Sequence, residues 1–377
     1  MTRTGMPMIA LIVLALVVTA CGDTPPTGAT SDEPAASVGA DESTAPASQP
    51  QTTPSEGRLA IVQDRGQLIC GVNGELPGFS VLNDEGEMEG FDADFCRAVA
   101  AAVLGDATAV EFRTLSADQR GPALQTGEVD VLIRNTTWTV SRDTQWGLFA
   151  PTTFYDGQAI MARADVGATT FEDLDDATVC VQSGTTTELN LADAESQAGI
   201  SIDEAVYADI DPTYQAYEEG VCDAVTSDRS QLVARRTEFA NPDDHVILDT
   251  VLSKEPLGPV APLGDDEGFQ IVKWTVFATI EAEELGITSA NVADEAASNT
   301  NPVVQRLLGV TPQDADPFES GLGLEADWVV DVISQVGNYG EIYDRNLGPD
   351  TPFALERGLN SLWNADPPGL LYAPPYR

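Results

Sequence analysis

Basic residues are scarce in this 377-residue chain. Its 18 lysines and arginines stand against 61 aspartates and glutamates, which gives a formal net charge of −43. Such a charge excludes a phosphate-tracking surface, because nucleic acid would be repelled. Lysine occurs only at Lys254 and Lys273, so the sequence offers no lysine-rich patch for anionic lipid. The acidity favours a body adapted to a salty medium, and an acidic binding face is the alternative.

Histidine is almost absent as well. The single His245 leaves no histidine pair for zinc or for a proton relay, which excludes histidine-based metalloenzymes. The turn-like segment 241–245, which contains His245, predicts that this residue has a structural role in a loop. The acidic run 265–267 could attract calcium, but no further ligand spacing supports it. The glycine-rich run 321–324 lacks the flanking strand and helix of a phosphate loop. We therefore expect no metal and no cofactor.

Long hydrophobic runs are also missing. The apolar run at 8–18 follows Arg3 and is too short to span a bilayer comfortably, so residues 1–20 are predicted to be a signal peptide. The residues Val18-Thr19-Ala20-Cys21 resemble a bacterial lipobox, which implies cleavage before Cys21 and lipidation of that residue. An ordinary cleaved signal with an incidental cysteine is the alternative.

The segment after Cys21 has the composition of a tether. Residues 22–57 contain six prolines, six acidic residues, no basic residue and only Val38 as a larger aliphatic. Such a segment cannot bury enough surface to offset its ordering entropy, so 21–57 is predicted to be a disordered, lipid-anchored tether. The folded body is expected to begin near Arg58.

From residue 58 onward, short apolar strands alternate with helical patterns. Strands are predicted at 67–72, 110–112, 129–133, 159–162, 178–181, 222–225 and 258–261. Helices are predicted at 91–104, 117–126, 187–197, 211–219, 230–236, 268–285 and 326–336. This order is typical of an α/β architecture.

A glycine that ends a helix, followed by an aspartate that opens a strand, occurs twice. The two segments are 126–130 and 219–223, and polar residues follow each strand. Open α/β sheets place ligands at the carboxyl ends of their strands. Two similar lobes with facing polar loops therefore predict a cleft.

The chain resembles the extracytoplasmic solute-binding proteins of polar and general L-amino-acid ABC transporters, bacterial solute-binding protein family 3. The segments that carry the resemblance are GFDADFCRAV (90–99), GEVDV (127–131), RNTTWTVSRD (134–143), CVQSGTTTELN (180–190), KEPLGP (254–259) and VGNYGEI (336–342). They extend over nearly all of the predicted folded body.

The resemblance implies a two-lobe, periplasmic-binding-protein-like type II fold, with a ligand cleft between lobes joined by two crossing strands. Lobe 1 would comprise 58–156 and 258–377, and lobe 2 would comprise 157–257. It also implies a monomer that captures L-amino acids, polar, acidic or amide or of broad range, and delivers them to a permease. The protein would be extracytoplasmic, anchored by lipid or free in a periplasm.

The resemblance further assigns residues to the ligand. The arginine that grips the α-carboxylate falls on Arg142, and Asn135 and Thr137 precede it. The hydroxyl after the Ser-Gly-Thr turn falls on Thr186, and the aspartate for the α-ammonium falls on Asp228. The remaining implied positions are Leu76, where relatives often carry a capping tyrosine, the nearby Phe79, and Arg120, which faces the ligand side chain.

Elementary chemistry agrees with a zwitterionic ligand. A guanidinium offers two parallel donors and suits a carboxylate better than lysine does. Residues 183–186 precede a helical pattern, where free N–H groups favour an anion. The plain alternatives are a surface arginine at 142 paired with a carboxylate, and a simple capping turn at 183–186.

Two other functions compete with a carrier. An enzyme on the same fold, such as a lytic transglycosylase or dehydratase domain, would need a catalytic acid or base in the cleft. No motif supplies one beyond Asp228. A receptor sensor domain is disfavoured because no second membrane segment precedes Arg377.

Export makes the other four cysteines candidates for disulfide bonds. With the lobes that the resemblance implies, we predict Cys70–Cys96 in lobe 1 and Cys180–Cys222 in lobe 2. Four buried free thiols are the alternative.

Overall fold

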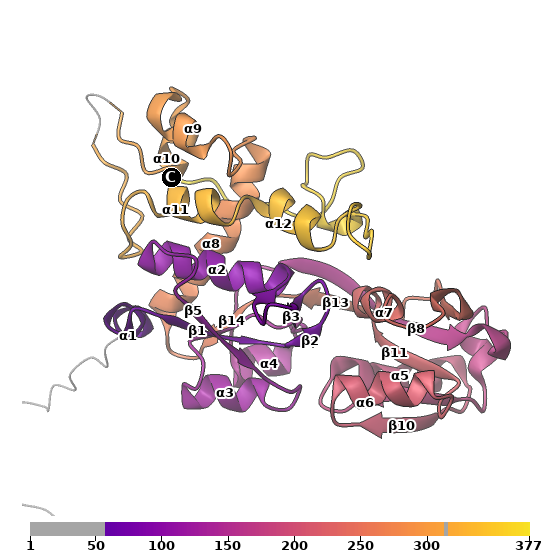
Figure 1. The fold of residues 1–377 in the computed structure, drawn as a ribbon. Helices are drawn as coiled ribbons and strands as arrows, with labels where there is room; N and C mark the ends of the chain where they lie inside the picture. Colours follow the sequence, from indigo (N-terminus) through magenta and orange to yellow (C-terminus); the bar gives the residue numbers. More distant parts are fainter. Residues whose placement is uncertain (1–56, 313–315) are drawn as a thin grey trace, which may run out of the picture. The chain divides into compact units, whose positions relative to one another are not determined.

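The computed structural model describes residues 57–312 and 316–377, and Figure 1 shows their helices and strands. The predicted signal peptide, Cys21 and the predicted tether up to residue 56 lie outside the described residues. Within the described ranges, no helix has both the length and the apolar character needed to cross a membrane.

One open sheet carries the first part of the chain and a returning strand. Its order is β5 (Val110–Thr114), β1 (Leu68–Val72), β6 (Val131–Leu132), β14 (Val260–Pro262) and β7 (Gly147–Phe149). Strand β1 runs parallel to β5 and β6, while β14 is antiparallel to β6 and β7. We call the part of the chain built on this sheet lobe 1.

The helices of lobe 1 come from both ends of the chain. They are α1 (Arg58–Arg65), α2 (Phe91–Leu104), α3 (Arg120–Thr126), α4 (Val140–Gln145), α8 (Asp266–Glu284), α9 (Val292–Ser298), α10 (Pro302–Leu307), α11 (Trp328–Gln335) and α12 (Tyr339–Asn346). Helix α2 packs against α8, α11 and α12. A small antiparallel sheet joins β2 (Glu75–Leu76), β3 (Ser80–Leu82) and β4 (Met88–Glu89).

A second open sheet carries the middle of the chain, which we call lobe 2. Its order is β10 (Asp203–Tyr207), β9 (Thr178–Gln182), β11 (Ala224–Asp228), β8 (Phe154–Arg163) and β12 (His245–Ile247), and β13 (Ser253–Leu257) also pairs with β8. Its helices are α5 (Thr186–Ala198), α6 (Ile210–Glu218) and α7 (Arg229–Arg236). Short 3₁₀ turns lie at 164–166, 171–174, 242–244 and 358–360.

Two antiparallel strands cross between the lobes. The chain enters lobe 2 along β8 and returns along β13, and residues 154–158 pair with residues 253–257. The predicted two-lobe α/β fold with two crossing strands is confirmed. The lobe limits given above, 58–156 with 258–377 and 157–257, stay predictions.

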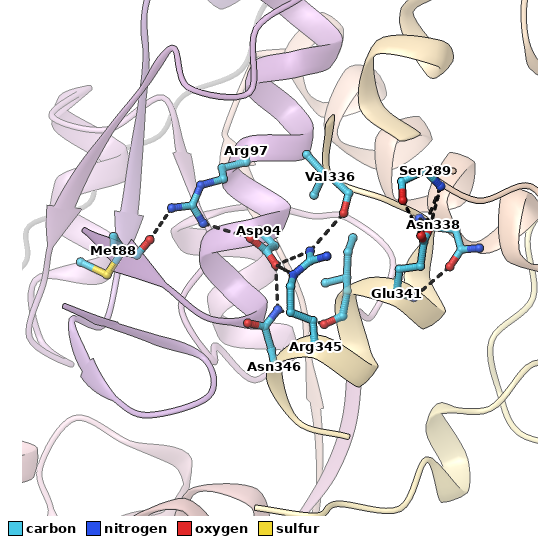
Figure 2. Close-up of polar contacts among 10 residues, drawn as sticks. Met88, Asp94, Arg97, Ser289, Val336, Asn338, Glu341, Arg345 and Asn346 are labelled. Atoms are coloured by element: carbon cyan, nitrogen blue, oxygen red, sulfur yellow. Dashed lines mark hydrogen bonds and ion pairs between the residues drawn. The ribbon is translucent and has the colours of Figure 1, made fainter. Parts of the chain in front are cut away.

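Polar contacts fasten the C-terminal helices of lobe 1 to helix α2 (Figure 2). Asp94 on α2 accepts hydrogen bonds from Arg345 Nη2 at 2.6 Å and from Asn346 Nδ2 at 2.7 Å, and it pairs with Arg97 at 3.0 Å. At the start of α12, Asn338 and Glu341 cap each other, and Glu341 also accepts from Ser289. Two of the family-like segments, 90–99 and 336–342, therefore include residues that hold helices together.

Both predicted disulfides are confirmed. Cys70 on β1 bonds Cys96 on α2, and Cys180 on β9 bonds Cys222 just before β11. Each bond lies within one lobe and leaves the crossing strands unconstrained.

Some element predictions need correction. Strand β8 begins at Phe154 rather than at 159, because its first half is the crossing strand and carries polar residues. His245 opens strand β12 instead of lying in a loop, and its Nδ1 is 2.9 Å from the hydroxyl of Tyr217. Asp265 caps α8, and no group of metal-ligating side chains occurs among the described residues.

Candidate functional site

A polar cavity lies where strand ends of both lobes meet. Its free volume is about 20 Å³, little more than the roughly 10–15 Å³ that one water molecule needs. The two walls therefore lie almost against each other. The lining residues are Arg120, Arg134, Asn135, Thr137, Arg142, Gln182, Thr185, Thr186, Thr187, Ser227, Asp228 and Gln231.

Arg142 forms part of the lobe 1 wall. Thr139 caps helix α4, accepting a hydrogen bond from the Arg142 amide, and this places the Arg142 side chain one turn into the helix. Its Nη1 donates to the carbonyl of Thr137 at 3.0 Å, and its guanidinium lies 5.0 Å from the ring of Trp146. Burial lowers the pKa of Arg142, while Glu255 and Asp228 raise it. Among the described residues, no carboxylate forms an ion pair with this guanidinium.

Two further arginines, both buried, extend this positive wall. Arg120 donates to the carbonyls of Ala117 at 2.9 Å and of Gly184 at 3.0 Å. Its guanidinium lies 5.5 Å from the centre of the same Trp146 ring. Arg134 donates to the carbonyl of Leu115 at 2.8 Å. Burial lowers the pKa of both, that of Arg134 to about 10. Buried cations held mainly by neutral carbonyls favour the binding of an anion beside them.

Asp228 is the carboxylate of the opposite wall. It ends strand β11, precedes helix α7 and is only 6% exposed. Burial raises its pKa well above the usual value, Asp156 and Glu255 raise it further, and Arg142 and Arg120 lower it. A cationic group in the cavity would offset this cost of ionising Asp228.

Asn135 is held in an unusual backbone conformation at the cavity. Its φ is 22°, and its N–H donates to the buried Asp92 at 2.7 Å. The side-chain oxygen accepts from Asn73 at 3.1 Å, and Nδ2 donates to Gln231 of lobe 2 at 3.4 Å. Non-glycine residues with positive φ cost free energy and persist where their surroundings fix them. Here the amide donor of Asn135 is aimed from lobe 1 at lobe 2.

The start of helix α5 contributes the hydroxyl side of lobe 2. Thr185 caps the helix, accepting from the amide of Glu188, and Thr186 and Thr187 follow. Gly184 just before it has φ +71°, and a Cβ there would lie 2.0 Å from Asp118 of lobe 1. The positive φ favours glycine at this turn, and the nearby Asp118 carboxylate would have to move to admit a Cβ. The turn brings the helix N-terminus, where N–H groups favour anions, to the cavity.

The structure brings together six of the eight predicted ligand residues. Arg120, Asn135, Thr137, Arg142, Thr186 and Asp228 all line the cavity.

The remaining two do not line it. Leu76 and Phe79 are fully buried, and the ring of Phe79 packs 5.3 Å from that of Phe154. Both belong to a hydrophobic cluster that includes residues of both lobes, and β2 with Leu76 packs against α7 of lobe 2, so their role at the ligand stays a prediction.

Sequence reasoning missed half of the lining residues: Arg134, Gln182, Thr185, Thr187, Ser227 and Gln231. A usable signal existed for most of them. Arg134, Gln182 and Ser227 lie at or just after carboxyl ends of strands, where open sheets place ligands. Gln231 lies one turn after Asp228 on the same helix start.

The two walls carry opposite charge. The lining cations, Arg120, Arg134 and Arg142, all belong to lobe 1, whereas the lining carboxylate, Asp228, belongs to lobe 2. Two more carboxylates, Asp156 and Glu255, face each other on the crossing strands. Such a cavity suits a ligand with an anionic end and a cationic end.

Comparison with known proteins supports this chemistry. Residues 68–349 match the model of the bacterial extracellular solute-binding proteins, family 3. The general L-amino acid-binding periplasmic protein AapJ of Rhizobium johnstonii is 48% identical over 320 residues, 85% of this chain and 92% of that protein. The glutamate/glutamine/aspartate/asparagine-binding protein BztA of Rhodobacter capsulatus is 44% identical over 324 residues, 86% of this chain and 94% of that protein.

A solved structure is similar over the same region. A periplasmic binding protein of an ABC transporter from Brucella ovis, with glutathione bound, is 48% identical with a TM-score of 0.81. The match covers 86% of this chain and 100% of the Brucella chain.

Proposed function

Since the chain belongs to family 3 of the bacterial extracellular solute-binding proteins, we propose that it binds L-amino acids outside the cytoplasmic membrane and delivers them to an ABC-transporter permease. The observation that carries this proposal is the cavity with buried arginines on one wall and the buried Asp228 on the other. Membership of this family confirms the prediction of a binding protein rather than an enzyme.

In the proposed complex, Arg142 and the first amides of helix α5 bind the ligand α-carboxylate, and Asp228 binds the α-ammonium. Asn135 and Thr137 add neutral hydrogen bonds from lobe 1. The ligand contacts both lobes, so its binding favours their closure. Because the cavity is nearly filled as it stands, the lobes must open to admit an amino acid.

Arg120 and Arg134 supply positive charge beyond what one α-carboxylate requires. We propose that they favour ligands with an acidic or amide side chain. The relative BztA, named for binding glutamate, glutamine, aspartate and asparagine, agrees with this preference.

Glutathione is a second candidate ligand, because the similar Brucella structure holds it. Its γ-glutamyl end carries a free α-carboxylate and α-ammonium, so the same clamp could hold it. The two candidates differ in the rest of the ligand, for which the cavity would have to open wider.

Calorimetric titration of the purified protein with the twenty L-amino acids and with glutathione tests the proposal. Arg142→Ala and Asp228→Asn should each weaken binding by roughly 30-fold or more, since one partner of a desolvated charged pair is lost. Arg113→Ala, at an exposed ion pair in lobe 1, is the matched control and should bind like wild type. Wild-type affinity in Arg142→Ala or Asp228→Asn would show that the clamp is wrongly assigned, and no binding of any ligand would refute the function.

We also propose that the mature protein is a monomer that begins at Cys21 and is anchored by lipid on that residue. The lipobox-like residues 18–21 support this proposal. The intact mass of the protein extracted from membranes should exceed the mass calculated for residues 21–377 by the mass of the attached lipid, and no such excess would contradict lipidation.

A further inference from the structure

A chain of side-chain hydrogen bonds links both lobes to a crossing strand. Thr137 Oγ1 in lobe 1 lies 3.2 Å from Thr186 Oγ1, which opens helix α5 in lobe 2. Thr186 Oγ1 in turn donates to Glu255 Oε2 at 2.9 Å, and Glu255 lies on β13. The first of these contacts lies between the two walls of the cavity.

The chemistry of Glu255 fixes the direction of the chain. This carboxylate is 1% exposed and also accepts from Asn190 Nδ2 at 2.9 Å and from Ser253 Oγ. An ionised carboxylate only accepts hydrogen bonds, and a hydroxyl has a single proton to give. Because the Thr186 hydroxyl donates its single proton to Glu255, its oxygen can only accept a hydrogen bond from Thr137.

We propose that Glu255 is a positioning residue that turns the Thr186 hydroxyl into an acceptor, so that Thr137 of lobe 1 latches onto it when the lobes close. The inference rests on the proposed function only in the choice of the ligand that is used to test it. In the closed state Thr186 offers its hydroxyl oxygen to N–H or O–H donors, and its backbone N–H, not its hydroxyl, faces an anion.

The latch is not the sole contact between the walls. Arg120 Nη2 donates to the carbonyl of Gly184 at 3.0 Å, and Asn135 Nδ2 donates to Gln231 at 3.4 Å. Loss of one hydrogen bond among several should therefore speed opening by about 3- to 10-fold without abolishing closure. Because the ligand enters only the open state, a variant that opens more readily should associate with the ligand at least as fast as wild type.

The test uses full-length Thr137→Val, Glu255→Leu, which removes the acceptor, and the double variant. Thr144→Val on α4 is the matched control, since Thr144 bonds only within its own helix. In ligand-free protein, hydrogen exchange of the amides around 134–138 and 184–188 should accelerate in both single variants. Exchange in the double variant should be little faster than in the single variants, because both changes break the same chain of hydrogen bonds. Thr186→Ser, which keeps the hydroxyl, should exchange like wild type.

L-Glutamate is the probe for binding to Glu255→Leu, chosen because Glu255 does not line the cavity. Stopped-flow should show faster dissociation in this variant, with association at least as fast as in wild type. Fully additive effects on exchange, or unchanged exchange in Glu255→Leu, would overturn the latch. If wild type fails to bind L-glutamate while exchange follows the pattern above, the latch stands and the ligand assignment falls. Circular dichroism establishes that each variant is folded.

Discussion

At the scale of single residues, the site depends on carboxylates that do not touch the cavity. Asp92 is 4% exposed, lies on helix α2 and holds the strained backbone of Asn135 through its amide. Burial raises the pKa of Asp92 to about 7, while the Asn135 N–H and Arg134 lower it. Folding therefore favours the protonated form of this side chain over the ionised one.

Asp92 should make stability depend on pH in a definite direction. Its pKa is raised on folding from 3.8 to about 7, so its stabilising contribution is complete below pH 4 and is lost as pH rises through 7. Asp92→Asn keeps an acceptor for the Asn135 amide but cannot ionise. We expect the fall in unfolding free energy between pH 5 and pH 8 to be smaller in the variant by about 1–3 kcal/mol.

Urea denaturation across that pH range measures the difference. Asp64→Asn, an exposed change on α1, serves as control and should follow the wild-type curve. Other acidic groups change the slope of both proteins equally, so parallel curves for Asp92→Asn and wild type would contradict the role assigned to Asp92.

At the scale of elements, the sequence predicted the longer helices and most buried strands but predicted crossing strands badly. It missed the short helices α1, α4, α9, α10 and α12. Helix α2 was predicted with its observed bounds, 91–104, because its apolar residues recur at helical spacing and Gly105 ends it. The first half of β8 escaped detection because Asp156 and Gln158 break the apolar run. Gln158 is buried and Asp156 is half-buried beside the crossing strand β13, which no local pattern reveals.

The residues of the site likewise divide into those that the sequence predicted and those that it did not. Arg142 could be assigned because it lies in the family-like segment 134–143, and Asp228 because the resemblance implies a carboxylate for the α-ammonium at this position. Arg134, which opens the same segment, and Gln231 were not assigned, because the resemblance implied no role for either, although each lies near a strand end where open sheets place ligands. Only the folded arrangement of two lobes brings these side chains to one cavity.

The junction between α2 and α12 should stabilise the fold without affecting binding. Asp94→Asn loses the ion pairs with Arg345 and Arg97 and weakens the contact with Asn346. We expect a loss of about 2 kcal/mol in unfolding free energy and an unchanged ligand affinity, because Asp94 does not line the cavity.

Chemical denaturation and calorimetry check the two halves of this prediction. Glu111→Gln breaks an exposed ion pair with Arg113 and should change stability by less than about 0.5 kcal/mol. A clear loss of ligand affinity in Asp94→Asn, at a temperature where the variant is folded, would contradict a purely stabilising role for this junction.

At the scale of the whole molecule, charge imbalance is the dominant feature. With a formal net charge of −43, most carboxylates have no cation to pair with, and self-repulsion opposes the compact state. The same imbalance isolates the few buried arginines of the cavity as its positive wall. In the proposed complex, the anionic end of the ligand therefore binds at lobe 1, where the cavity is positive although the protein as a whole is negative.

Added salt should therefore stabilise the protein. The Debye length falls from about 30 Å at 0.01 M to about 3 Å at 1 M ionic strength, so repulsion between surface carboxylates is screened. We expect the melting temperature at pH 7 to rise by at least about 3 °C between 0.01 and 1 M sodium chloride, which corresponds to roughly 2 kcal/mol for a folded body of this length.

A measurement at acidic pH is the internal control for the effect of salt on the melting temperature. At pH 4.5 part of the carboxylates are protonated, the repulsion is weaker, and the same salt step should raise the melting temperature less than at pH 7. Salting-out of apolar surface would instead act at both pH values alike. Calorimetric scans at the two pH values separate the causes: an equal rise would assign the stabilisation to salting-out, and a flat or falling melting temperature at pH 7 would show that self-repulsion does not limit stability.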